Sequence, residues 1–142
     1  MTYATLDHLR DRFGEQMLVQ LTDRAFPPTG AIGVEVVARA LTDTDAVING
    51  SLAKRYRLPL GEVPDLVADL ALTIAIYKLH VFAPDQKIKE DYEGALRTLR
   101  DVSTGVVVLD LAGIEPTSSG AGGVVATDRD RPLTSETLRG FI

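Results

Sequence analysis

The segment from Val63 to Phe82 constrains the fold more than any other part of the sequence. It is the most apolar stretch of the chain, yet it contains the charged residues Asp65, Asp69 and Lys78. Those charges make it a poor membrane span and favour a buried helix that Pro64 opens and that extends to about Phe82. Apolar residues occupy both sides of this helix. Such a helix is either central in the fold or covered by another subunit.

Two short helices are predicted before this segment. Thr5 and Gly14 stand where an N-cap and a C-terminal stop would bound a helix over residues 6–13. A second short helix is expected over Glu15–Thr22. The stretch Asp23–Gly33 contains two prolines and two glycines, which predicts a loop.

Two longer helices flank the apolar segment. From Val34 to Tyr56 apolar residues recur at steps of three and four, which predicts a long amphipathic helix. Gly50 inside it is unfavourable, and a close helix crossing would explain it. A further helix opens at Pro84-Asp85 and stops at Gly105. The following run, Val106–Leu111, is of β type but has no obvious partner strand.

The composition changes after Leu111. Of the 111 residues through Leu111, 54 are apolar, against 10 of the 31 that follow. We therefore expect a mainly α protein: a small helical bundle with a long central helix hairpin and a short β-type segment over residues 1–111. Residues 112–142 are expected to form a flexible linker and an extended C-terminal docking arm. The alternative for the arm is a frayed terminus without a role. The candidate partner-docking residues are Leu133, Leu138, Arg139, Phe141 and Ile142.

The inventory of reactive side chains is small. The chain contains no cysteine, which excludes disulfides, thiolate zinc sites, iron–sulfur clusters and a cysteine nucleophile. His8 and His80 are its only histidines and neither belongs to a nucleophile motif, so both are interpreted as surface or partly packed residues. The acidic stretch from Asp43 to Gly50 lacks the ligand pattern of a calcium loop. We expect no catalytic, cofactor-binding or metal-binding residues, and no enzymatic activity.

The charge balance limits the possible partners. Fifteen basic against twenty acidic residues give a net charge of −5, which argues against a protein that wraps nucleic acid. Lys54, Arg55 and Arg57 form the only tight basic group. They follow the long helix, where cations complement the helix dipole, and a phosphate or partner contact is the alternative. The N-terminus carries no secretory signal pattern, and no membrane span is expected.

A series of motifs resembles the small neck proteins of Mu-type tailed phages and their prophage relatives. The first motifs are Tyr3-Ala4-Thr5, Arg12-Phe13-Gly14, Gln20–Asp23, Ala40-Leu41 and Asp45-Ala46. Later ones are Leu52-Ala53, Arg55-Tyr56, Leu58–Leu60, Val63-Pro64, Tyr92, Ala95-Leu96, Gly105 and Leu138–Phe141. They cover nearly the whole chain in order. The chain departs from the pattern at Asn49, where an acid is expected, and over residues 134–137.

The resemblance implies a structural virion protein, a head–tail connector or adaptor without catalytic activity or cofactor. Such proteins form a ring, commonly of about twelve copies, beneath the portal protein, and they offer a platform to the next neck, stopper or tail component. DNA would pass through the channel without specific binding. The expected location is the virion neck, and the host cytoplasm during assembly. The alternatives are a small neck-associated hydrolase or nuclease, and a helical regulatory module.

Overall fold

Local capping chemistry sets the first helix. The computed structural model describes residues 1–111, and in it α1 (Leu6–Phe13) begins directly after Thr5. The hydroxyl of Thr5 accepts a hydrogen bond from the backbone N–H of His8, while His8 Nδ1 accepts one from the Thr5 N–H, both at 3.3 Å. Gly14, with a φ of +87°, ends α1, and α2 (Glu15–Thr22) follows at once. Both short helices are where the sequence predicts them.

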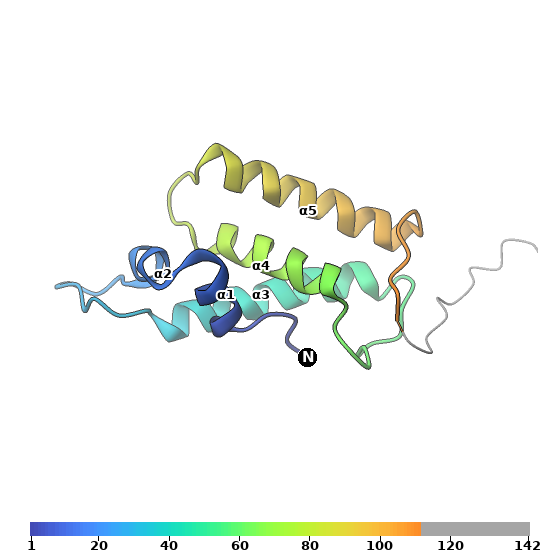
Figure 1. Ribbon diagram of the computed structural model, residues 1–142, viewed down its shortest axis with the longest axis horizontal. Coiled ribbons are helices and arrows are strands. Elements are labelled where there is room, and N and C mark those ends of the chain that lie inside the picture. The colour runs from blue at the N-terminus through green and yellow to red at the C-terminus, as the bar shows by residue number, and fades with distance from the viewer. Residues whose placement is uncertain (112–142) are drawn as a thin grey trace, which may run out of the picture.

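Three longer helices form the bundle. They are α3 (Val34–Leu52), α4 (Asp65–Leu79) and α5 (Gln86–Thr104). Figure 1 shows them side by side, each running opposite to the one before it. The two short helices pack against one end of α3 and α4. The described chain is therefore mainly α, as predicted.

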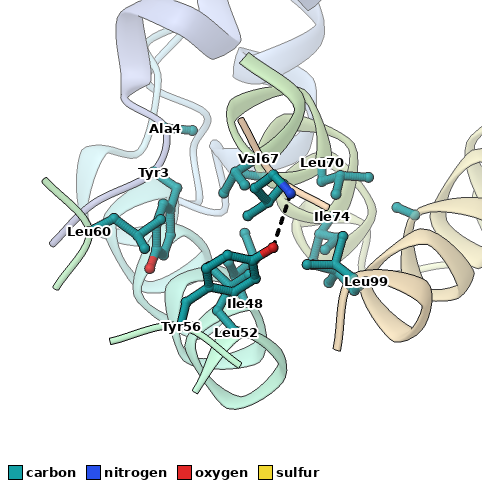
Figure 2. Close-up of a cluster of buried hydrophobic side chains, with 14 of the residues drawn as sticks. Tyr3, Ala4, Ile48, Leu52, Tyr56, Leu60, Val67, Leu70, Ile74 and Leu99 are labelled. Carbon is teal, nitrogen blue, oxygen red and sulfur yellow. Dashed lines mark hydrogen bonds between the residues drawn. The ribbon is translucent and has the colours of Figure 1, made fainter. Parts of the chain in front are cut away.

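The position of α4 decides between the two alternatives that its sequence leaves open. On one side, Val67, Leu70 and Ile74 pack in a buried cluster with residues of α3 and α5, part of which Figure 2 shows. On the other side, Ile76 and Leu79 pack in a second cluster with residues of α1, α2 and α3. The helix is thus central, and the chain itself covers both of its apolar sides.

Both long apolar segments end before the residues predicted for them. The helix expected to reach Tyr56 ends at Leu52, and residues 53–55 form a turn. Tyr56 is still buried, which explains why its spacing continues the apolar pattern. The helix expected to reach about Phe82 ends at Leu79, and Phe82 lies in the loop before α5.

The β-type run forms no strand within the described residues. Along it, Leu109 and Leu111 are buried, whereas Val106 and Val108 are exposed, so the side chains alternate between the core and the surface. A strand also needs a neighbouring strand to hydrogen-bond its backbone, and none lies beside this segment in the described chain. The run instead packs one side onto the bundle as the chain leaves α5.

The predicted helix crossing at Gly50 is wrong, because a Cβ added there would have no atom within 4 Å. None of the helices described is both long and apolar enough to span a membrane. The predicted linker and arm, residues 112–142, lie outside the described residues.

Candidate functional site

The N-terminal motif tyrosine attaches the start of the chain to α3. The backbone N–H of Tyr3 donates to Asp45 Oδ1 at 3.0 Å, and its hydroxyl donates to Asn49 Oδ1. These partners lie 42 and 46 residues along the chain. Asn49 is the position where the neck-protein pattern leads us to expect an acid. Its amide oxygen accepts the phenolic proton as a carboxylate oxygen would, so the departure preserves this contact.

A second motif tyrosine holds the segment that follows α5. The hydroxyl of Tyr56 accepts a buried hydrogen bond from the backbone N–H of Leu109 at 3.0 Å, which is the dashed line in Figure 2. Among residues 1–111, no strand lies beside the run from Val106 to Leu111. The Tyr56 hydroxyl therefore supplies an acceptor to a buried backbone N–H that no strand partner satisfies.

One residue of the basic group after α3 contacts a different helix. Arg55 Nη1 donates to the carbonyl oxygen of Thr104 at 3.4 Å, at the C-terminus of α5. The guanidinium therefore complements the dipole of α5. Gly105 stands beside it in the left-handed conformation, with a φ of +86°, and a Cβ there would lie 2.1 Å from Arg55 Nη1. The motif residues in this region thus hold the fold together.

We expect the buried Tyr3 phenol to make the stability of the protein fall as the pH becomes alkaline. Burial, and secondarily the charge of Asp45, raises the pKa of the Tyr3 phenol above 10.0. Because this pKa is higher in the folded than in the unfolded protein, the protonated phenol contributes fully to stability below the unfolded-state pKa. That contribution to the free energy of unfolding is lost as the pH rises through the folded-state pKa. Unfolding measured from about pH 9 to about pH 11 should show this loss. Tyr3→Phe should show a shallower decline, and identical slopes would contradict the assignment.

Tyr56→Phe is expected to lower the free energy of unfolding by about 1–3 kcal/mol, because the Leu109 N–H is left buried without its acceptor. Tyr77→Phe is the matched control. Tyr77 stacks on Tyr92 with ring centroids 3.8 Å apart, and its hydroxyl has no hydrogen bond among the described residues. Urea denaturation followed by circular dichroism compares the two variants, and equal losses would exclude the proposed role of the Tyr56 hydroxyl.

Large exposed apolar side chains gather at two opposite ends of the bundle. The aromatic end consists of Phe26, Val34, Val81 and Phe82, and the exit end consists of Leu66, Val106 and Val108. Figure 1 shows the corresponding segments at opposite ends of the long helices. Phe26 is 100% and Phe82 is 87% exposed, which is unusual for phenylalanine. Apart from Met1, these are all the large apolar residues exposed in the described chain.

A charged hollow of about 270 Å³ lies next to the aromatic end. Its lining residues come from the 23–33 loop, α3 and α4, and the charged ones are Arg24, Glu35, Arg39, Asp43 and Lys78. No ion pair within 4.0 Å joins these charges among the described residues.

The side chain of Asp23 orders the 23–33 loop that carries Phe26. Asp23 accepts hydrogen bonds from the backbone N–H groups of Gly30 and Thr29, at 2.7 and 3.2 Å. These bonds, that of Gly30 first, lower the pKa of the Asp23 carboxyl. The exposed Phe26 is therefore presented from a loop with a defined conformation.

The exit end has a groove of different character, about 440 Å³ in volume. Its two sides are the segments 62–66 and 108–110. Glu62, Asp65 and Asp110 are its charged residues, and Leu66 and Val108 are among its apolar ones. We call this surface the exit groove.

Each candidate reactive residue has its own place in the helical framework. His8 serves the α1 cap, and His80 Nδ1 lies 2.7 Å from the carbonyl oxygen of Ile76. Asp43 and Asp45 lie on α3, a helix and not a loop, and Asp45 binds Tyr3. Within residues 1–111 no group of three histidine or acidic side chains is placed to hold a metal ion.

Sequence reasoning and the structure point to different surface residues. The predicted docking residues Leu133, Leu138, Arg139, Phe141 and Ile142 lie outside the described residues. The exposed phenylalanines were missed, although a signal exists. Phe26 directly precedes two prolines, and Phe82 stands two residues before Pro84, so both belong to segments where a helix cannot continue.

Residues 3–127 match the protein family described as Bacteriophage Mu, Gp36. The chain is 31% identical to "Gene product J" of Escherichia phage Mu over 142 residues, which is the whole of both chains. It is 28% identical to "Mu-like prophage FluMu protein gp36" of Haemophilus influenzae, over 99% of this chain and 98% of that one. The resemblance to a Mu-type phage family is thereby confirmed: the chain belongs to the Bacteriophage Mu Gp36 family.

Proposed function

We propose that this protein is a structural component of a Mu-type phage particle, a head–tail connector that binds as a ring beneath the portal. The observation that carries the proposal is the match over the full length of phage Mu gene product J, joined to the neck-protein motifs of the sequence. A match over both whole chains favours a shared role of the entire protein.

The surface of the described residues supports a role in binding other proteins. Its exposed apolar side chains lie at both ends of a helical body, and exposed phenylalanines are typical anchors of protein interfaces. Exposed apolar surfaces of this kind suit a protein that other protein chains cover in an assembled particle.

The same residues favour this role over the alternatives. A hydrolase or nuclease needs a nucleophile, base or metal held together. Here His8 contributes to the cap of α1, His80 contacts the carbonyl oxygen of Ile76, and Asp45 binds Tyr3. A DNA-binding regulator needs a basic surface. Here the net charge is −5, and acidic residues share the hollow that holds Arg24, Arg39 and Lys78. An acidic protein suits a channel through which DNA slides.

The experiment is negative-stain imaging of purified portal mixed with the full chain. Twelve-fold density beneath the portal is the expected result, and the absence of any complex would contradict the proposal. Replacing both histidines by glutamine in the phage is the matched test for enzymatic activity. Loss of infectivity in particles of normal structure would favour an enzyme instead.

We expect deletion of residues 112–142 to separate folding from assembly. Both buried clusters lie within residues 1–111, so the truncated chain should keep the helical circular-dichroism signal of the full chain. Its binding to the portal should be weaker, because the predicted docking residues are removed. Equal affinity of the two chains for the portal, measured by titration, would contradict the docking arm.

A further inference from the structure

The two ends of the bundle differ in charge as well as in position. The hollow beside the aromatic end contains Arg24, Arg39 and Lys78, which outnumber its two acidic residues. The exit groove is lined by three acidic residues and by no basic one. Both surfaces add exposed apolar side chains to these charges. Each end therefore has the apolar character and the sign of charge that would complement the other.

We propose that the aromatic end of one copy binds the exit groove of the next copy of the same chain. This inference rests on the proposed ring and specifies the contact that builds it. Phe26 and Phe82 would pack against Leu66 and Val108 of the neighbour, while the cations of the hollow meet its groove carboxylates. Val106 of the neighbour lies at the rim of this contact.

Charge disfavours the simpler symmetric arrangement. Joining two aromatic ends would bring together the six cations and only four carboxylates of the two hollows, and joining two exit grooves would bring together six carboxylates and no cation. Like charges brought together across an interface cost several kcal/mol. A head-to-tail contact brings opposite charges together instead. Contacts of this heterologous type generate a ring when the rotation between copies closes.

The other basic residues near the exit end do not change this picture. Lys54 and Arg57 follow α3 at the same end of the bundle, but neither lines the groove. Arg55 contacts the carbonyl of Thr104 at the end of α5. Among residues 1–111, neither Glu35 nor Asp43 forms an ion pair within 4.0 Å with the cations of the hollow.

Charge reversal tests the complementarity. The variant Arg24→Glu with Arg39→Glu should weaken association between full-length chains at least about tenfold, measured by sedimentation at high concentration. Lys89→Glu with Arg100→Glu makes the same change in charge on exposed positions of α5, and it is expected to weaken association less than about threefold.

Reversing both ends in one chain is the decisive step. Adding Glu62→Lys and Asp110→Lys to the hollow variant restores opposite charges across the contact, and association should return to within about threefold of the original. An effect no larger than that of the α5 control, or no recovery in the combined variant, would overturn the inference. The inference would also be overturned if the chain stayed monomeric at all concentrations and no cross-link formed between Val81→Cys and Val106→Cys.

Cross-linking tests the same contact independently of charge. Because the chain has no cysteine, Val81→Cys with Val106→Cys places single thiols on the two surfaces. A bis-maleimide reagent should then join copies into a ladder of multiples, both in concentrated solution and on the portal. Lys89→Cys with Val106→Cys is the control, and an equal ladder from it would overturn the inference.

The two proposals fail in different ways. Twelve-fold density on the portal without the Val81–Val106 cross-link would refute the head-to-tail contact and leave the connector role standing. A ladder of cross-linked copies in solution with no binding to the portal would support the head-to-tail contact and refute the connector role.

Discussion

Replacing Ile74 by alanine is expected to lower the free energy of unfolding by about 2–5 kcal/mol. Ile74 is fully buried on α4 in the cluster shared with α3 and α5, where Figure 2 shows it close to Leu99. Removing three carbons there leaves a cavity that three helices would have to close together. Close-packed interiors relax only in part, so the cost includes lost burial and lost contacts.

Leu66→Ala is the control for this prediction. Leu66 lies on the same helix but is 37% exposed, and its replacement is expected to cost less than about 1 kcal/mol. Thermal and urea unfolding of the full chain, followed at the helical circular-dichroism signal, give both values. Comparable losses in the two variants would mean that α4 is not the centre of the core.

The second large effect is expected at Gly105, where Gly105→Ala should cost about 1–3 kcal/mol. Gly105 ends α5 in the left-handed conformation, which an L-residue adopts only with strain. A Cβ would also lie 2.1 Å from Arg55 Nη1, so the guanidinium would have to move away from the Thr104 carbonyl.

Gly50→Ala is the same chemical change with the opposite expected sign. Gly50 lies inside α3 with open space around it, so alanine should stabilise the protein by up to about 1 kcal/mol through its higher helix propensity. Urea denaturation of both variants under the same conditions compares their free energies of unfolding. If Gly105→Ala proves as harmless as Gly50→Ala, the αL stop at the end of α5 is contradicted.

Helix starts and stops that depend on nearby residues were predicted well. Thr5 caps α1 and Gly14 ends it, and Gly105 ends α5, because these signals act within one turn of the backbone. The errors lie where apolar spacing continues beyond a helix. Tyr56 keeps the period of α3 but reaches the core from a turn, and Phe82 extends the apolar run of α4 into an exposed loop.

For the candidate site too, the sequence identified some residues and the structure was needed for others. The motifs identified the family, and Tyr3, Tyr56 and Arg55 were among their residues. Their partners, Asn49, Leu109 and Thr104, lie 46, 53 and 49 residues away, so the sequence alone could not show that these motifs hold the fold together. The exposed phenylalanines became candidates only when their segments were seen at one end of the bundle.

By itself, the sequence determined a helical body, its phage family, its lack of thiol chemistry and its acidic charge. The family follows from the resemblance of the motifs, and the other three follow from composition, from periodicity and from contacts within about four residues. Only the tertiary structure decided that α4 is central, that the β-type run pairs with no strand of residues 1–111, and that the exposed apolar residues described form two opposite ends of unlike charge. These outcomes depend on which distant surfaces meet. Packing sets that choice through the apolar area buried between whole elements, and no local pattern records it.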